Sequence, residues 1–178
     1  MCQALGLPPS RKYQDEGGPS LADCIRILTQ TVIDPAKDTH ALIRWIAFCA
    51  LLGNADGHAK NLSLLRVERG WQLAPFYDLV CTALYPQHDR HLAMRVGPNN
   101  DPGNLNANHW RALAADCKVG ARLVLETVRE MTDRIDTVTS ARVAWFRDTY
   151  GESPVLQMLP RAIRRHARRV PARDPRER

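Results

Sequence analysis

A short polar insert between two apolar runs gathers side chains that could do chemistry. Residues 51–65 read LLGNADGHAKNLSLL. Asp56 lies five residues before Asn61, and a second aspartate, Asp78, follows an aromatic pair. Carboxylates accept protons or hold cations, and amide oxygens are neutral ligands for the same cations. The insert adds three further polar side chains, Asn54, His58 and Lys60.

The elements around the insert are predicted to bring Asp78 back beside it. Residues 41–52 are apolar on nearly all sides, which predicts a buried helix that is capped by Asp38 or Thr39 and ended by Gly53. After the insert, LSLLRV and WQLAPF flank a turn that contains glycine, and this pattern predicts a β-hairpin. Because a hairpin returns the chain to its starting point, we expect Asp78 to lie close to the insert.

The rest of the chain predicts a mainly α fold around this single hairpin. Residues 1–19 contain Pro-Pro and Gly-Gly-Pro and are expected to be rich in loops. Ser20 is predicted to cap a helix that ends near Val32, and residues 80–107 are expected to be irregular. The later helices are predicted from Asn108 to about Val119 and over residues 121–136, 137–150 and about 154–169.

The net charge of +6 is concentrated at the C-terminal end. Residues 1–160 contain 17 Lys and Arg and 17 Asp and Glu, whereas residues 161–178 contain eight Arg and two acidic residues. An Arg-rich terminal run is most often a solvated, flexible tail, and the alternative is a surface for nucleic-acid phosphates. The length of 178 residues and the hydrophobic content of 44% are those of one ordinary globular domain.

Cysteine usage and hydropathy favour a cytoplasmic protein. The five cysteines are scattered without a CxxC pair, which argues against a disulfide framework and against a zinc site. No apolar signal region follows Met1, and no stretch approaches the length of a membrane span. We therefore expect no membrane partner.

The spacing of the polar residues is that of a phosphoryl-transfer site. In protein kinases, an Asp of the catalytic loop accepts the proton of the substrate hydroxyl and an Asn of the same loop holds Mg²⁺. A second Asp holds the metal against the phosphates of ATP. Asp56, Asn61 and Asp78 match this arrangement. His58 and Lys60 would add hydrogen-bond donors or positive charge near the phosphates.

Simpler interpretations compete for single residues of the insert. Asn-Ala-Asp-Gly at 54–57 is also a common helix-ending turn. It does not begin a calcium loop, because the twelfth position is Leu65 instead of Glu. A structural hydrogen bond explains His58 as well as a functional role does. Core packing is the better explanation of the aromatic pair Phe76 and Tyr77.

Four stretches of the chain resemble the HipA family of bacterial toxin kinases. They are CQALGLPPSRKY at 2–13, GGP at 17–19, LLGNADGHAKNLSLL at 51–65 and LAPFYDL at 73–79. The likeness covers the chain up to the Arg-rich end. It implies the C-terminal lobe of a protein-kinase-like fold, helical with a small central β-hairpin, and phosphorylation of a protein Ser or Thr by ATP.

The resemblance also implies roles by position. Asp56 would be the catalytic base, and Asn61 and Asp78 would be the Mg²⁺ ligands. The residues that would contact ATP are His58, Lys60 and Tyr77, and the alternative for His58 and Lys60 is that they support the loop. The implied partners are a HipB-like helix-turn-helix antitoxin, through which DNA would be met only indirectly, and a protein substrate such as the aminoacyl-tRNA synthetase for glutamate.

One residue of the insert departs from ordinary protein kinases. Those enzymes have Lys two residues after the catalytic Asp, whereas this chain has His58 there. His at this position is the pattern of phosphoinositide-kinase-like enzymes. A phosphotransferase of that type is therefore an alternative.

The sequence shows no pattern of a nucleotide-binding N-terminal lobe. A kinase needs a Gly-rich loop and a strand Lys with a Glu partner, and the ten glycines include no Gly-x-Gly. We expect an inter-lobe segment at 1–19, the C-lobe at 20–160 and the flexible tail at 161–178. The N-lobe would be encoded as a separate chain. Otherwise the chain is a non-catalytic remnant that binds an antitoxin or nucleic acid, or the product of a degraded gene or misplaced start codon. Alone, it should bind Mg-ATP weakly at best.

Overall fold

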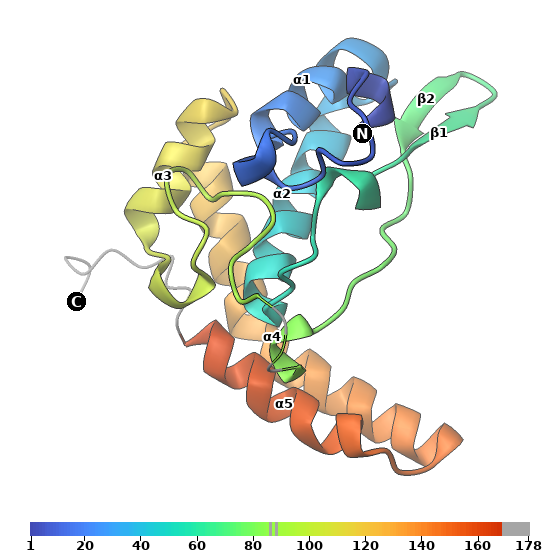
Figure 1. The fold of residues 1–178 in the computed structure, drawn as a ribbon. Helices are drawn as coiled ribbons and strands as arrows, with labels where there is room; N and C mark the ends of the chain where they lie inside the picture. The colour runs from blue at the N-terminus through green and yellow to red at the C-terminus, as the bar shows by residue number, and fades with distance from the viewer. Residues whose placement is uncertain (86, 88, 169–178) are drawn as a thin grey trace.

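The apolar helix ahead of the polar insert forms the centre of the fold. The computed structural model describes residues 1–85, 87 and 89–168, and the central helix is α2, Pro35–Leu52. Its neighbours bury it on almost every side, which explains its nearly uniform apolar sequence (Figure 1). The other helices are α1 (Leu21–Thr31), α3 (Ala107–Asp116), α4 (Ala121–Tyr150) and α5 (Pro154–Ala167). The predicted mainly α fold is confirmed.

Helix α2 begins earlier than predicted. Its first residue is Pro35, and the side chain of Asp34 caps it by accepting the backbone N–H of Lys37. The cap predicted at Asp38 or Thr39 is therefore wrong. Proline is tolerated at the first helical position because the N–H that it lacks would have no partner within the helix.

The starts of α1 and α3 show two outcomes of cap prediction. Ser20 caps α1 as predicted, and it forms a reciprocal capping box with Asp23. Helix α3 is capped by Asn106 instead of Asn108, so that prediction is wrong by two residues. The Asn106 side chain accepts the N–H groups of Asn108 and His109.

The two helices predicted at 121–136 and 137–150 form the single helix α4. Ile135 and Thr139 are buried on either side of the predicted break. Packing on both sides of this point therefore keeps the helix continuous, although the Asp-Thr sequence between them is a weak helix former.

Helix α5 contains part of the segment expected to be a flexible tail. The expected boundary after residue 160 falls inside the helix, and Ala162, Ile163 and His166 are buried. The tail is thus helical as far as Ala167. The rest of it, residues 169–178, lies outside the described residues.

The predicted hairpin is confirmed, with shorter strands than expected. Strands β1 (Leu64–Val67) and β2 (Gly70–Leu73) pair antiparallel and are the one two-stranded sheet in the described part of the chain. Figure 1 shows the hairpin at one end of the molecule, beside α1 and α2.

Two hydrogen bonds fix the hairpin to the helices. The N–H of Ile33, just after α1, donates to the Trp71 carbonyl at 2.9 Å. The N–H of Leu73 donates to the buried Asp38 carboxylate at 2.8 Å. Asp38 thus anchors the strand that leads toward Asp78, although its sequence position resembles that of a helix cap.

The segment at 80–107 is irregular, as predicted, and it lies against the N-terminal segment. It contains short 3-10 turns at Thr82–Leu84 and Pro102–Asn104. The N–H of Gln14 donates to the Ala93 carbonyl at 3.0 Å, and the N–H of Arg95 donates to the Gln14 side chain at 2.8 Å. The N-terminal segment and the segment at 80–107, which are far apart in sequence, are therefore joined side by side.

The apolar core has two parts. The larger cluster surrounds α2 and includes the fully buried Trp45 and Trp110. The smaller cluster lies where α2, α4 and α5 meet, and it consists of Leu52, Cys81, Ile135, Ala162 and Ile163. Among the described helices, none is both long and apolar enough to cross a membrane.

Candidate active site

The polar insert leaves α2 through a turn that is held on both sides. Gly53 ends the helix as predicted, with φ of 68°, a left-handed conformation that glycine adopts without strain. The Thr82 hydroxyl donates to the Gly53 carbonyl and accepts the N–H of Ala55, both at 2.8 Å. A residue from beyond the hairpin therefore fixes the first turn of the insert.

Asn54 fixes the backbone that carries the predicted base. Its amide is buried, and its Oδ1 accepts the N–H of Asp56 at 3.1 Å. Gly57 follows, where an added Cβ would lie only 2.8 Å from the sulfur of Cys49. The Asn-Ala-Asp-Gly sequence thus serves a local structural purpose, as the turn interpretation predicts, and it places the Asp56 carboxylate that the chemical interpretation requires.

Three side chains converge on one oxygen of Asp56, and two of them donate hydrogen bonds to it. Its Oδ1 lies 2.8 Å from the Tyr13 hydroxyl, 3.2 Å from Lys12 Nζ and 3.4 Å from His58 Nε2. Partial burial acts to raise the pKa of Asp56, but the hydrogen bonds from Tyr13 and Lys12 outweigh it, so the pKa lies below its ordinary value. Asp56 is therefore ionised at neutral pH, as a general base must be.

Lys12 and Tyr13 are the residues of the site that sequence reasoning missed. They lie within the CQALGLPPSRKY stretch that carried the family resemblance, but nothing in their local pattern points to Asp56. The contact from Lys12 to Asp56 spans 44 positions of sequence. Only the folded arrangement of the N-terminal segment shows it.

His58 is a neighbour of the base. It is buried, and its ring meets the edge of Tyr13 with 5.7 Å between ring centroids. Burial lowers the pKa of His58, and the Asp56 carboxylate opposes that effect only in part. The imidazole is therefore neutral at pH 7, so His58 does not supply the positive charge that phosphates attract.

Asn61 and Asp78 meet as the hairpin predicted. The side-chain amide of Asn61 donates to Asp78 Oδ2. The Asn61 Oδ1 atom is buried and has no hydrogen-bond partner within the described residues. Asp78 has φ of 56°, an uncommon value for a residue with a side chain. Such backbone conformations cluster at functional sites.

The two aromatic residues before Asp78 have different environments. Phe76 packs against Trp45 of α2, with 6.3 Å between ring centroids, as the packing interpretation predicts. Tyr77 is exposed to 44%, so that interpretation does not hold for it. The Tyr77 hydroxyl donates to the Lys60 carbonyl at 2.8 Å and lies 2.8 Å from the Ser63 hydroxyl. Tyr77 therefore ties the chain after β2 to the chain before β1.

A cavity of about 640 Å³ opens beside these residues. Asp56 and Asp78 both line it, together with Lys12 and Tyr13, whereas His58, Lys60 and Tyr77 do not. The N-terminal segment and the segment at 80–107 supply the remaining walls. Its carboxylates are Asp15, Glu16, Asp56, Asp78 and Asp89. The cavity is thus an acidic space with the candidate base on its wall.

The oxygen atoms at Asn61 and Asp78 fit a Mg²⁺ ion that is shared with phosphate. Mg²⁺ takes one or two protein carboxylates and completes its shell with water and phosphate oxygens. The unpartnered Asn61 Oδ1 and the Asp78 carboxylate supply such ligands. Over the described residues, no group of three or more His, Cys, Asp or Glu could hold a metal ion. A site built wholly from those residue types is thus absent from the described part.

Comparison with known proteins gives a consistent result. The family model for the HipA-like C-terminal domain matches residues 1–140. The chain is 38% identical over 148 residues to "Putative kinase Y4mE" of Sinorhizobium fredii, covering 83% of this chain and 34% of that protein. It is 27% identical over 144 residues to the serine/threonine-protein kinase toxin HipA of Shewanella oneidensis, covering 75% and 33%. The chain thus spans about a third of the length of these curated relatives.

A solved structure shares the fold. It is the Shewanella oneidensis MR-1 toxin–antitoxin complex of HipA, HipB and operator DNA, with a TM-score of 0.84 and 22% identity. The match covers 95% of this chain and 42% of that one. The family model spans most of this chain, and it includes the insert, the hairpin and Asp78. The chain therefore belongs to the family of HipA-like C-terminal domains.

Proposed function

We propose that this chain is the catalytic lobe of an ATP-dependent kinase that phosphorylates a protein Ser or Thr hydroxyl. The observation that carries the proposal is the cavity that Asp56 and Asp78 share, with Asn61 bound to Asp78 behind it. Two carboxylates, a neighbouring amide and an open space thus occur together, and these are the groups that a base, metal ligands and a substrate would require. The relatives named as kinases and the HipA toxin kinase add support through family membership.

Each residue has a distinct part in the reaction. Asp56 accepts the proton of the substrate hydroxyl as its oxygen attacks the γ-phosphorus of ATP. Asn61 Oδ1 and the Asp78 carboxylate would hold Mg²⁺, which when bound would neutralise and orient the phosphates. The hydrogen bond between Asn61 and Asp78 keeps the two ligand side chains in register.

The nucleotide needs a second lobe in this proposal. The chain spans about a third of the length of its curated relatives, and the N-terminal segment and the segment at 80–107 form walls of the described cavity. A further lobe, in the same polypeptide or in a separate one, would cover the adenine and the remaining phosphate contacts.

A HipB-like helix-turn-helix antitoxin is the proposed partner. The solved structure of the same fold is a complex of HipA with HipB and operator DNA. DNA would then be contacted through the antitoxin, in the cytoplasm, and the phosphorylated partner would be a protein such as an aminoacyl-tRNA synthetase.

The test is phosphate transfer by the chain joined to the N-terminal lobe of a relative such as Y4mE. With radiolabelled ATP, we expect Asp56→Asn and Asp78→Asn each to lower the rate by about 10³-fold, because each removes a charge required in the transition state. Asp116→Asn, on the exposed end of α3, is the matched control and should keep the rate of the unmodified protein. Wild-type rates in Asp56→Asn would refute the proposal.

Metal binding provides a second readout that does not depend on transfer. Titration with Mn²⁺ should broaden the NMR signals of Asn61 and Asp78 in the unmodified chain. The same titration of Asp78→Asn should leave the Asn61 signal sharp. Broadening that is unchanged in this variant would place the cation elsewhere.

A further inference from the structure

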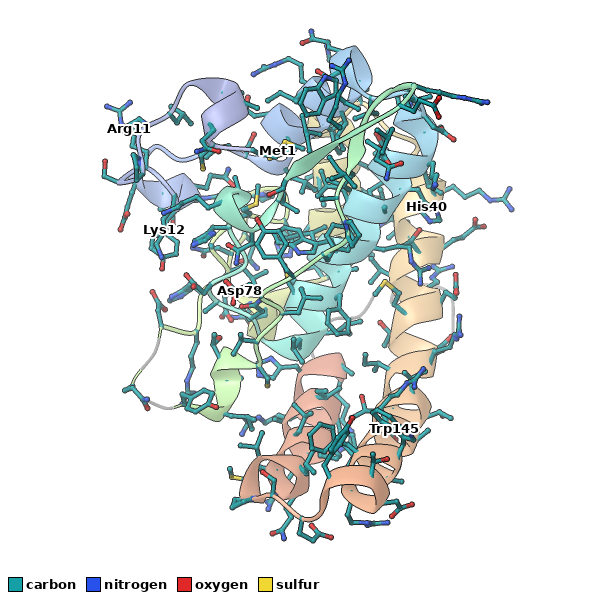
Figure 2. The ribbon with its side chains drawn as sticks, turned by 90° about the vertical axis from the view of Figure 1, so that its right-hand side faces the viewer. Met1, Arg11, Lys12, His40, Asp78 and Trp145 are labelled. Atoms are coloured by element: carbon teal, nitrogen blue, oxygen red, sulfur yellow. The ribbon has the colours of Figure 1, made fainter. Side chains whose placement is uncertain are left out.

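The active-site cavity contains one ammonium group, and it does not come from the polar insert. Among the described residues that line the cavity, Lys12 is the only Lys or Arg. Its Nζ atom lies 3.2 Å from Asp56 Oδ1, so the charge stands directly beside the candidate base. Lys60 of the insert is exposed and does not line the cavity. Figure 2 shows Lys12 on the N-terminal segment, on the same side of the view as Asp78.

Tyr13 makes the shortest contact to the base. Its hydroxyl lies 2.8 Å from Asp56 Oδ1, and its ring rests against the buried His58. Burial raises the pKa of Tyr13, so the phenol keeps its proton and acts as the donor. The ammonium of Lys12 is 4.6 Å from the centre of the same ring. Lys12 and Tyr13 therefore act on Asp56 as one unit.

The side chains around Asp56 all approach the same oxygen of its carboxylate. Tyr13, Lys12 and His58 approach Oδ1, and Oδ2 makes no hydrogen bond with any described residue. A carboxylate held by one oxygen has a fixed orientation and keeps the other oxygen available. That is the arrangement a general base needs, because the incoming hydroxyl must reach an unoccupied lone pair.

We propose that Lys12 is the catalytic cation that contacts the transferred phosphoryl group and that Tyr13 is a positioning residue that holds Asp56 by Oδ1. This inference rests on the proposed kinase function, and it assigns to the N-terminal segment a part of the site that the insert does not supply. It also replaces His58 and Lys60 as the expected source of positive charge, because neither of them lines the cavity.

The charges balance through the transfer step. The substrate oxygen forms a bond to the γ-phosphorus while the bond from that phosphorus to the bridging oxygen breaks, and ADP leaves with the electron pair. The hydroxyl proton passes to Asp56 Oδ2. Once the carboxyl group is neutral, its attraction for the Lys12 ammonium weakens, so the full positive charge of Lys12 can act on the phosphoryl oxygens as they pass.

If Lys12 were purely structural, Lys12→Met would lower the thermal stability of the chain, and the exposure of the ion pair argues against that. The Lys12 and Asp56 side chains are 31% and 46% exposed, and an ion pair this open adds little to folding stability. Lys12→Met should therefore leave thermal unfolding almost unchanged while it removes the cation. Arg11→Met is the matched control, because Arg11 is the exposed neighbour of Lys12 and does not line the cavity.

The first experiment measures how Lys12 and Tyr13 act on Asp56, and it uses the chain alone, whether or not that chain transfers phosphate. The pKa of Asp56 is read from the pH dependence of its carboxyl ¹³C signal. Tyr13→Phe and Lys12→Met should each raise this pKa toward the ordinary value, since each removes a contact that lowers it. Arg11→Met should leave it unchanged. An Asp56 pKa that is the same in the unmodified chain and in all three variants would overturn the proposed action of Lys12 and Tyr13 on Asp56.

The second experiment uses the two-lobe protein of the transfer assay. Lys12→Met should lower kcat by about 10²-fold with little change in KM for ATP, and Lys12→Arg should restore part of the rate. Tyr13→Phe should lower kcat by about tenfold and move the acidic limb of its pH profile to higher pH.

The outcomes separate this inference from the proposed function. Full activity in Lys12→Met together with loss of activity in Asp56→Asn would overturn the role of Lys12 and leave the kinase proposal standing. A greater loss in Lys60→Met than in Lys12→Met would assign the cation to Lys60. Activity that persists in Asp56→Asn would refute the kinase proposal itself.

Discussion

The cavity beside Asp56 and the groove between α4 and α5 are similar in volume and opposite in chemistry. The first measures about 640 Å³ and has five carboxylates on its walls. The second measures about 550 Å³ and is lined mainly by apolar side chains of α2, α4 and α5, including Phe48, Phe146 and Leu159. The first is suited to binding charged groups, and the second is a product of apolar packing.

The polar cavity depends on a few contacts between loops, and the groove depends on helix packing. Hydrogen bonds between residues far apart in sequence join Tyr13 to Asp56 and Asn61 to Asp78. The groove instead follows from the small cluster where α2, α4 and α5 meet. Single polar substitutions should therefore change function at the cavity, and truncations of apolar side chains should change stability at the groove.

The two regions are separate but adjoin at one point. Trp145, on the far part of α4, lies well away from both Lys12 and Asp78 in Figure 2. However, Val80 lines both cavities, and a Cβ on Gly53 would come within 2.8 Å of His166 on α5. The turn that begins the polar insert thus rests against the last helix.

The largest expected effect is on activity and comes from the polar side. Asn61→Ala should lower the transfer rate of the two-lobe protein by about 10²–10³-fold, equivalent to about 3–4 kcal/mol. Its free energy of unfolding should fall by only about 1 kcal/mol, because the amide oxygen that is removed has no hydrogen-bond partner in the described structure, and the hydrogen bond that is lost ends on the exposed Asp78 carboxylate, which water can solvate. Kinetic assays and urea denaturation of the same sample test both statements. A large loss of stability would make Asn61 a structural residue.

The packing side should show the reverse pattern. Ile163→Ala removes a buried side chain from the cluster at the base of the groove and should lower the free energy of unfolding by about 2–4 kcal/mol. The folded fraction should keep its transfer rate. Met158→Ala on the same helix is the control, since Met158 is 48% exposed, and it should change stability by about 0.5 kcal/mol or less. Equal effects of the two variants would mean that α5 is not packed as described.

The sequence predicted what short-range pattern determines. The hairpin, the buried α2 and the turn at Gly53 follow from residues within a few positions of one another, and the return of Asp78 to Asn61 follows from the hairpin. The helix break expected near Thr137 was wrong because packing outweighed a weak local preference.

Contacts across long sequence separations were beyond that reasoning. Asp38 resembles a helix cap in sequence, but its carboxylate accepts the N–H of Leu73, which is 35 positions away. Lys12 and Tyr13 contact Asp56 across a similar separation. Such pairs depend on how α1, α2 and the N-terminal segment pack together, and no local periodicity encodes that packing.

A smaller effect is expected where the hairpin meets α2. Asp38→Ala leaves the buried N–H of Leu73 without its acceptor and should lower the free energy of unfolding by about 1–3 kcal/mol. Because β2 leads to Asp78, the variant should also weaken transfer modestly. Glu68→Ala in the exposed turn of the same hairpin is the control. Denaturation curves that coincide for the two variants would contradict an anchoring role for Asp38.

The smallest expected effect is a dependence of stability on pH at His58. Burial lowers its pKa in the folded chain, whereas the unfolded chain has the ordinary value of about 6.5. Between the folded and unfolded pKa values the unfolded chain binds more protons, so acid favours unfolding. The contribution is complete above about pH 6.5 and is lost as the pH falls through the folded value.

His58→Gln should reduce this dependence, because glutamine has no proton to gain. Urea denaturation of the chain and the variant at pH 7.5 and 5.5 gives the difference, with the other histidines common to both proteins. Asp56 limits the effect, since its negative charge at 3.4 Å favours the protonated imidazole and offsets part of the cost of burial. Combining His58→Gln with Asp56→Asn tests this: in the Asp56→Asn background the dependence removed by His58→Gln should be larger. A smaller one would mean that the Asp56 charge does not reach the ring.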